Sequence, residues 1–361
     1  MPQELKAEID ARKDDLAKQI TDLHFERHPD LDKKYGPIGR VKCHEDAKYH
    51  LSYLAEAVGS AQPDLFADYV LWAKFMLEGR GVPAEDLLEN LKVIREVTSA
   101  TLSAEVSAIA SRCIDAGIEQ LESSQKNTSA KSSIELELPC RITQDNPHCE
   151  LATNYLQALL RGDRQAASTM ILDAVKSGTT VKELYLHVFQ PSQHEVGRLW
   201  QINELSVAQE HYCTAATQLI MSQLYPYIFS TTKSGKSMVA TCVSGDLHEI
   251  GIRMISDFFE MEGWDTFYLG ANVPVDSVVK SIKDRKAQLL AVSATMTFHI
   301  NAVRRLVDAI RADSAVSRTI IIVGGYPFNL APDLWKEIGA DGHATDAEAA
   351  LRIAHELSAK S

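Results

Sequence analysis

An aspartate and a histidine two residues apart, directly after an apolar run, form the first pattern in this sequence that could do chemistry. The run 238–243 predicts a buried strand, and Asp246, His248 and Gly251 follow it across a short turn into the next helix. An imidazole can bind a metal through one ring nitrogen while a carboxylate holds the proton on the other. We therefore expect a metal ligand at His248, its supporting acceptor at Asp246, and room for a flat group beside Gly251.

The elements around this pattern predict a parallel sheet. From Met238 onward, short apolar runs alternate with helical patterns, which is typical of strands buried between two layers of helices. Five such strands favour a flavodoxin-like, Rossmann-like α/β fold, in which ligands bind at the carboxyl ends of the strands. We assign this domain to residues 237–361, with strands at 238–243, 266–269, 289–293, 319–323 and near 342–344.

Two further loops at predicted strand ends carry recognisable residues. Ser293-Ala294-Thr295 follows the third strand, and Gly324-Gly325 follows the fourth. Together with the first pattern they resemble the D-x-H-x-x-G, S-x-L and G-G signature of cobalamin-binding domains, with Thr295 where leucine is common. A plain flavodoxin-like domain with a chance D-x-H-x-x-G is the alternative, but three motifs in the right order and spacing disfavour it.

The resemblance implies a corrinoid cofactor whose benzimidazole tail inserts into the edge of the sheet. It implies that His248 replaces this tail as the lower axial ligand of cobalt, with Asp246 as its partner. Further contacts with the tail would come from Ser293 and Thr295, while the backbone would close on it at Gly324 and Gly325.

A helical segment precedes the sheet and could cover the other face of such a cofactor. Residues 145–229 show helical patterns without strands, and we expect a four-helix-bundle cap there. Ser206 and Gln209 form a capping-box pattern, which predicts that one helix ends before them and another begins. This helical hairpin can place the following residues on one side of a planar ligand: Trp200, Glu210, His211 and, one or two turns before Trp200, His194 and Val196.

The W-x9-E-H spacing in this cap resembles the adenosylcobalamin-dependent photoreceptors. That resemblance implies that Trp200 packs over the adenosyl group of adenosylcobalamin, that Glu210 hydrogen-bonds to it, and that His211 binds cobalt after light breaks the Co–C bond. The expected function is a light sensor without an output enzyme domain. Its signal would pass through light-dependent assembly of a homo-oligomer or through a separate signalling partner.

Two other cobalamin functions are alternatives. A corrinoid carrier protein of a methyltransferase system also has a helical cap and D-x-H-x-x-G, but it needs an open upper face for a methyl donor. A subunit of a radical isomerase needs a substrate-binding barrel, and this sequence shows no pattern for one.

Residues 1–125 show helical patterns throughout and predict an all-α, sensor-type domain. A helical domain joined to such a cap and cobalamin domain resembles the photocobilins, which implies biliverdin as a second, bilin chromophore. The serine-rich stretch within 126–144 predicts a linker. Helices are expected at 3–25, 38–58, 63–77 and 83–121, with a loop at 28–37, and the last pattern is long enough for one helix or two.

Candidate residues for biliverdin lie mainly on the second of these helices. Asp46 could accept hydrogen bonds from pyrrole N–H groups, Arg40 could pair with a propionate, and Trp72 could form an apolar wall. Tyr49, His50 and Tyr53 are neighbours of Asp46 at helical spacing. An ordinary helix surface over a core is the alternative for these residues.

Composition excludes some partners. The net charge is −12, and residues 1–125 carry 15 Lys and Arg against 23 Asp and Glu, so we expect no direct contact with nucleic acid. No apolar run reaches transmembrane length and the N-terminus is polar, so we expect a cytoplasmic protein without a membrane partner. Six cysteines without C-x-x-C spacing are expected to be reduced.

Overall fold

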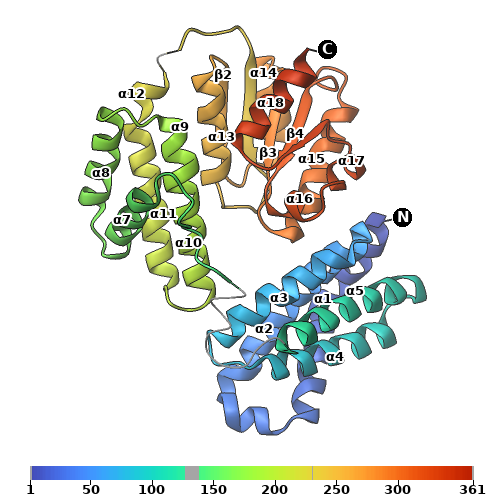
Figure 1. Ribbon diagram of the computed structural model, residues 1–361. Coiled ribbons are helices and arrows are strands. Elements are labelled where there is room, and N and C mark those ends of the chain that lie inside the picture. Colours follow the sequence, from blue (N-terminus) through green and yellow to red (C-terminus); the bar gives the residue numbers. More distant parts are fainter. Residues whose placement is uncertain (1, 127–137, 230, 360–361) are drawn as a thin grey trace. The chain divides into compact units, whose positions relative to one another are not determined.

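The structure is a computed structural model that describes residues 2–126, 138–229 and 231–359. The chain divides into two compact units, Met1–Glu137 and Leu138–Ser361, and each is described by itself (Figure 1). Most of the linker predicted at 126–144 lies outside the described residues. Within the described residues, no helix combines the length and the apolar character that a membrane crossing requires.

The first unit is helical in all of its described residues, which confirms the helical prediction for this region. Helix α1 packs along α2, and α3 packs along α5 (Figure 1). Pro63 occupies the first turn of α3, where its missing N–H costs no hydrogen bond. The helices are α1 (Pro2–Arg27), α2 (Asp30–Ser60), α3 (Pro63–Glu78), α4 (Ala84–Thr101) and α5 (Ala104–Lys126).

Two predictions for this unit need correction. The loop expected at 28–37 is wrong, because helix α2 already begins at Asp30 and bends at Gly36, where φ is 63° and ψ is −169°. Glycine accepts this positive φ, so the chain changes direction and resumes the helix at Pro37. The long pattern at 83–121 is two helices, because Leu102 adopts an extended conformation with φ −88° and ψ 162° between α4 and α5.

The second unit contains the parallel sheet that the alternating pattern predicted. Its order is β2-β1-β3-β4-β5, and every pairing is parallel, so the doubly wound, flavodoxin-like prediction is confirmed. The order changes direction at β1, and the two strands beside it are β2 and β3. The strands are β1 (Ser237–Cys242), β2 (Asp265–Gly270), β3 (Leu289–Ser293), β4 (Ile320–Gly324) and β5 (Gly342–Ala344).

Helices cover both faces of the sheet, which explains why its central strands are apolar along their whole length. Helices α13 (Ile250–Met261) and α18 (Ala347–Ser358) pack against one face. Helix α14 (Val275–Arg285) covers the other face, where α15 (Ile300–Ala312) packs beside it (Figure 1). All five residues of β3 are buried as a result.

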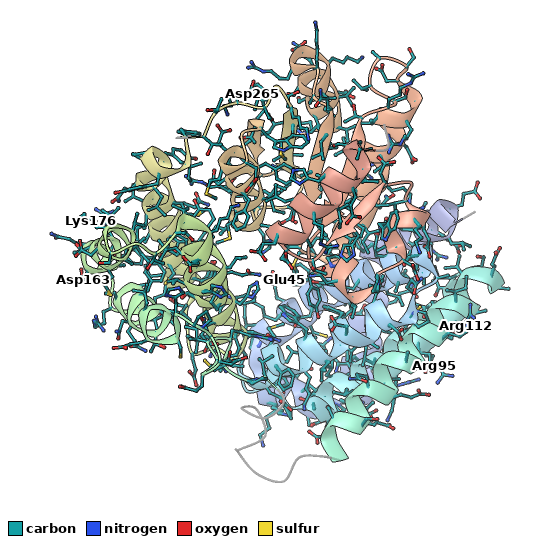
Figure 2. The ribbon with its side chains drawn as sticks, turned by 45° about the horizontal axis from the view of Figure 1, so that its top comes forward. Glu45, Arg95, Arg112, Asp163, Lys176 and Asp265 are labelled. Carbon is teal, nitrogen blue, oxygen red and sulfur yellow. The ribbon has the colours of Figure 1, made fainter. Side chains whose placement is uncertain are left out.

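Residues 138–229 form a helical segment, here called the cap, that shares one hydrophobic core with the sheet domain. Helix α11 begins with the predicted capping box, because Ser206 and Gln209 bond each other's backbone N–H groups. Figure 2 labels Asp163 and Lys176 at the two ends of α8, where an acceptor and a cation suit the helix dipole. The cap elements are α7 (Cys149–Leu160), α8 (Arg164–Lys176), α9 (Val181–Leu184), η1 (Tyr185–Phe189), α10 (Gln190–Gln201), α11 (Val207–Gln223) and α12 (Tyr225–Ile228).

Polar contacts also join the cap to α13 of the sheet domain. The Tyr185 hydroxyl donates to Asp257 Oδ2 at 2.7 Å, and Arg253 donates to the Gln218 carbonyl and to Ser222 Oγ at 3.1 and 2.8 Å. These groups are largely buried, so the contacts define how the cap sits on the sheet domain. The four-helix-bundle description of the cap stays a prediction.

Candidate functional site

The turn after β1 holds the aspartate and the histidine in direct contact. Gly245 has a φ of 91°, which turns the chain so that Asp246 is fully buried while the His248 side chain is 60% exposed. Asp246 Oδ1 accepts hydrogen bonds from His248 Nδ1 at 2.8 Å and from the His248 backbone N–H at 3.0 Å. Because the carboxylate can only accept, the Nδ1 proton of His248 points toward it and Nε2 keeps the lone pair.

The other oxygen of Asp246 is held from the neighbouring strand. The Thr295 backbone N–H, in the loop after β3, donates to Oδ2 at 2.6 Å, and His299 Nδ1 lies 3.5 Å from the same oxygen. Burial by itself raises the pKa of Asp246, but these contacts and those from His248 hold it well below its usual range. Asp246 is therefore a carboxylate at neutral pH.

The carboxylate in turn acts on the imidazole. The hydrogen bond to Asp246 is the largest cause that raises the pKa of His248, burial opposes it, and the negative charge of Glu210 adds to it. A more basic imidazole is a stronger ligand, although a metal must displace its proton at low pH.

The donor set decides what kind of metal this site fits. Among the residues that the structure describes, no three His, Cys, Asp or Glu side chains converge on one point. A bare Zn²⁺ or Fe²⁺ would need three or four such ligands, whereas a cobalt ion in a corrin ring needs only one axial imidazole from the protein. The single His248 ligand therefore fits a corrinoid and does not fit a free metal ion.

The motif glycines have two different structural roles. A Cβ on Gly251 would meet no atom within 4 Å, so the first turn of α13 leaves open space beside the histidine. A Cβ on Gly325 would lie only 2.0 Å from the Ala294 carbonyl oxygen, at a φ of 101°. At Gly324 it would lie 3.0 Å from the Ala344 carbonyl oxygen. Gly325 and Gly324 thus let the loops after β3, β4 and β5 approach one another.

The two other predicted tail contacts lie at the same edge. Ser293 is the last residue of β3 and is 8% exposed, and Thr295 is half-buried two residues later. The structure shows that Thr295 also contributes its backbone N–H to Asp246, which side-chain reasoning missed. The three predicted loops therefore meet at the carboxyl edge of β1, β3 and β4.

Glu210 and His211 form a bonded pair at the start of α11. Glu210 Oε2 lies 2.5 Å from His211 Nδ1, and Thr214 Oγ1 donates to the other carboxylate oxygen at 2.9 Å. Hydrogen bonds then continue through Gln193 to Thr217, which bonds the buried Tyr155 hydroxyl at 2.7 Å. This network, which the sequence did not suggest, fixes the Glu210 carboxylate while the His211 side chain is 74% exposed.

The remaining predicted cap residues differ in exposure. Trp200 lies one residue before the end of α10 and packs partly buried against the core, and His194 is exposed. Val196 is 1% exposed and lies inside the core, so packing accounts for this residue and it presents no surface to a ligand.

The biliverdin candidates in the first unit are only partly brought together. His50 and Tyr53 are buried, with His50 Nδ1 2.8 Å from the Tyr69 hydroxyl and Tyr53 stacked on the Tyr69 ring. The other candidates are spread over the surface or pair elsewhere: Arg40 pairs with Asp32, Tyr49 is 59% exposed, Asp46 and Trp72 are half-buried, and Trp72 stacks near Tyr69. Burial raises the pKa of Asp46 to about 6.

Comparison with known families identifies both parts of the second unit. Residues 236–352, which cover the sheet domain, match the model of the B12 binding domain. Residues 151–225, which cover most of the cap, match a second B12 binding domain model. The chain therefore carries B12-binding domains, and a cobalamin or related corrinoid is its cofactor class.

The chain is also similar to corrinoid proteins of the genus Methanosarcina. It is 31% identical over 129 residues to dimethylamine corrinoid protein 2 of Methanosarcina mazei, covering 36% of this chain and 59% of that protein. It is 24% identical over 212 residues to monomethylamine corrinoid protein 2 of the same organism, covering 57% and 96%. The matches to three dimethylamine corrinoid proteins span only 59%, 53% and 57% of their lengths.

One solved structure confirms the fold of the second unit. The monomethylamine corrinoid protein of Methanosarcina barkeri superimposes with a TM-score of 0.52 at 22% identity. The superposition covers 58% of this chain and 99% of that protein. The Rossmann-like B12-binding architecture is thus shared over the whole length of a corrinoid protein.

These relatives overturn the expected light-sensing function. They are named as corrinoid proteins of methylamine systems, which supports the corrinoid carrier alternative over the photoreceptor. The W-x9-E-H spacing misled because it rests on only three side chains, at the end of α10 and the start of α11. The light-dependent assembly inferred from that function loses its basis as well.

Proposed function

We propose that this chain is a corrinoid carrier protein that passes methyl groups between partner methyltransferases, with a methylated amine as the first donor. The observation that carries this proposal is the Asp246–His248 pair at the sheet edge of a B12-binding domain whose relatives are methylamine corrinoid proteins. When bound, the corrinoid supplies a cobalt centre that can accept and release a methyl group. Activation of the donor and of the acceptor belongs to the partner proteins.

The residues of this chain bind and orient the cofactor. His248 offers Nε2 to cobalt because Asp246 holds the proton on Nδ1. The open space beside Gly251 would accommodate the ring, and Ser293, Thr295 and the Gly324–Gly325 loop would surround the tail. In the cap, Trp200 and the Glu210–His211 pair would border the upper face of the cofactor, and the indole of Trp200 would limit the access of water there.

Transfer of a labelled methyl group tests the proposal. The chain is loaded with cobalamin under reducing, anaerobic conditions and mixed with methylamine methyltransferases and ¹⁴C-labelled mono-, di- or trimethylamine. We expect label to be retained by the loaded chain and then passed to a thiol when an acceptor methyltransferase is added. Absence of label on the loaded chain with all three amines would contradict the amine-carrier function.

Two variants test how the Asp246–His248 pair holds the cofactor. His248→Ala should remove the nitrogen signal of the axial ligand from the electron paramagnetic resonance spectrum of the bound Co(II) corrinoid. Asp246→Ala should weaken corrinoid binding by about 10-fold to 100-fold, the usual effect of losing the partner of a metal-bound histidine. A spectrum of His248→Ala identical to the wild type would remove His248 from the site.

Two further questions are whether the bound corrinoid carries an adenosyl group and whether the first unit binds biliverdin. Isolation of the chain from cells supplied with adenosylcobalamin and biliverdin tests both by absorption spectroscopy. A red-absorbing band beside the corrinoid bands would support biliverdin in the first unit. Retention of the adenosyl group through gel filtration would support the adenosyl form.

A further inference from the structure

A short segment that leads into the cap forms neither a helix nor a strand, yet it is bonded to α10. This segment, residues 138–148, is here called the strap, and it begins where the second unit begins. It runs beside α10 before the chain enters α7 (Figure 1). Ile142 packs against the shared core, but most side chains of the strap are exposed. The course of the strap therefore depends mainly on hydrogen bonds.

Two residues of α10 bind the backbone of the strap. The Arg141 N–H donates to Glu195 Oε2 at 2.8 Å, and Arg198 Nη1 donates to the Leu138 carbonyl oxygen at 3.4 Å. Glu195 and Arg198 also bond each other, with Nε 2.9 Å from Oε2 and Nη2 2.7 Å from Oε1. Glu195 is only 3% exposed, and a carboxylate that has lost its water needs such donors. The strap N–H therefore helps to satisfy a buried charge.

A third contact joins the strap to the π-helix η1. Pro191, in the first turn of α10, lacks the N–H that would bond the His187 carbonyl in a regular α-helix. Asn146 Nδ2 donates to this carbonyl at 2.8 Å, and the rings of His148 and His187 lie 5.9 Å apart. The strap thus supplies a side-chain donor at the junction of η1 and α10.

Helix α10 is also bonded to the network that holds Glu210. Gln193 Oε1 accepts from Thr214 Oγ1 at 3.3 Å, and the same hydroxyl donates to Glu210 at 2.9 Å. Near its other end, α10 carries Trp200. One helix therefore connects the anchors of the strap with the cap residues at which we place the upper face of the corrinoid.

We propose that the strap is a conformational latch of the cap, docked by the buried Glu195–Arg198 pair and tightened when a corrinoid binds. A cofactor that packs against Trp200 and Glu210 restricts α10, and a restricted α10 keeps its contacts with the strap aligned. The coupling is reciprocal, so release of the strap weakens corrinoid binding by the same factor. This inference rests on the proposed function in one respect, the placement of Trp200 and Glu210 at the upper face.

Hydrogen–deuterium exchange of the full-length protein, with and without cobalamin, tests the latch. Mass spectrometry with electron-transfer fragmentation resolves single amides of the strap. Without cobalamin, the Arg141 amide should exchange at least about tenfold more slowly than in an unstructured peptide, because it is bonded to a buried carboxylate. Saturating cobalamin should slow its exchange by a further factor of about five or more.

A double variant removes the anchors without leaving a buried charge. Glu195→Leu with Arg198→Met replaces the ion pair by apolar side chains of similar size, which proteins often tolerate. Exchange at Arg141 should rise by about 10-fold to 100-fold, as expected for a hydrogen bond to a charged group. Cobalamin should bind more weakly by the factor with which it slows exchange in the wild-type strap.

A single variant removes the third contact and has a matched control. Asn146→Ala should raise exchange in the strap by about threefold to tenfold, as expected for one net hydrogen bond. Asn154→Ala, at an exposed position of α7, should leave both the exchange and the cobalamin affinity unchanged. Equal effects of the two variants would remove the Asn146 contact from the latch.

The wild-type protein decides even where a variant does not fold. An Arg141 amide that exchanges as in an unstructured peptide would overturn the docked strap. Equal exchange with and without bound cobalamin would overturn the coupling, and so would full cobalamin affinity in a double variant whose strap exchanges freely. Methyl transfer enters none of these measurements, so a failure of the carrier function and a failure of this inference are told apart.

Discussion

At the scale of single residues, the site depends on which groups are buried and where the backbone leaves room. Asp246 is fully buried and accepts hydrogen bonds from His248 and from the Thr295 backbone, whereas the His248 side chain is 60% exposed and keeps one nitrogen free. Gly251 and Gly325 differ in the space around them. A Cβ on Gly251 would meet no atom, whereas a Cβ on Gly325 would clash with the backbone of Ala294.

Substitution of the two glycines by alanine should therefore have different effects. Gly325→Ala should lower the free energy of unfolding by at least about 2 kcal/mol, because it adds a Cβ clash to an unfavourable positive φ. Gly251→Ala, in an unobstructed helical turn, should leave stability unchanged or raise it by up to about 1 kcal/mol, but weaken corrinoid binding. Urea unfolding and corrinoid titration measure both effects. Full corrinoid affinity in Gly251→Ala would show that the cofactor does not use this space.

The buried carboxyl of Asp257 should make the stability of the protein depend on pH. Burial raises its pKa from 3.8 to about 6, although Tyr185 and Arg253 oppose the rise and Glu260 adds to it. The folded state therefore binds more protons than the unfolded state between about pH 4 and pH 6, and this contribution to stability is lost as pH rises. Between pH 4.5 and pH 7, the stability of Asp257→Asn relative to the wild type should rise by about 2 kcal/mol. Urea unfolding at both pH values checks this, and a constant difference would exclude titration of Asp257.

At the scale of elements, each chemical group is positioned by the start or the end of a strand or a helix. The turn after β1 and the loop after β3 meet at Asp246. The capping box fixes the first turn of α11 and thereby the positions of Glu210 and His211. Hydrogen bonds from Glu210 to Tyr155 tie this helix start to α10 and α7. The start of α11 is therefore held both by its own capping box and by hydrogen bonds to residues far away in the chain.

Loss of the cap of α11 should be measurable. Ser206→Ala removes the hydroxyl that accepts from the Gln209 N–H, and it should lower the free energy of unfolding by about 1 kcal/mol. Ser281→Ala, at a half-buried mid-helix position on α14, is the matched control and should change stability by less than about 0.5 kcal/mol. Equal effects of the two variants would mean that the capping box adds nothing to the stability of α11.

At the scale of the whole molecule, the corrinoid site belongs to one unit. Every contact described for Asp246, His248 and Glu210 comes from residues of Leu138–Ser361, whose cap and sheet domain share one core. The first unit has its own buried residues on α1 to α5. Binding of the corrinoid and the role of the first unit can therefore be studied separately.

A chain of residues 138–361 should bind cobalamin with the same axial histidine signal as the full chain. We expect its dissociation constant to agree within about threefold, because no described contact of the site is removed. Corrinoid titration followed by electron paramagnetic resonance of the Co(II) form measures both properties. A soluble, folded fragment without corrinoid affinity would show that the first unit contributes to the site.

The sequence alone determined the parallel sheet, its doubly wound order and the contact between Asp246 and His248. Alternating apolar runs and helices specify a parallel sheet because both of its faces are buried, and a ligand at its edge follows from the polar residues at the strand ends. Asp246 and His248 are neighbours in the chain, so their contact could be predicted from spacing. The start of α11 at Ser206 was predictable for the same reason.

Only the tertiary structure decided what lies around that pair. His299 and Thr295 reach Asp246 from another strand, Val196 is enclosed in the core, and Gly36 bends a helix that spacing predicted to be a loop. Each of these depends on contacts between residues far apart in the chain or on a single backbone angle, which residue spacing does not encode. Spacing is a local property, and it brought the candidate ligand pair together, whereas the packing of strands against one another determined which groups surround Asp246 and how much space is left there.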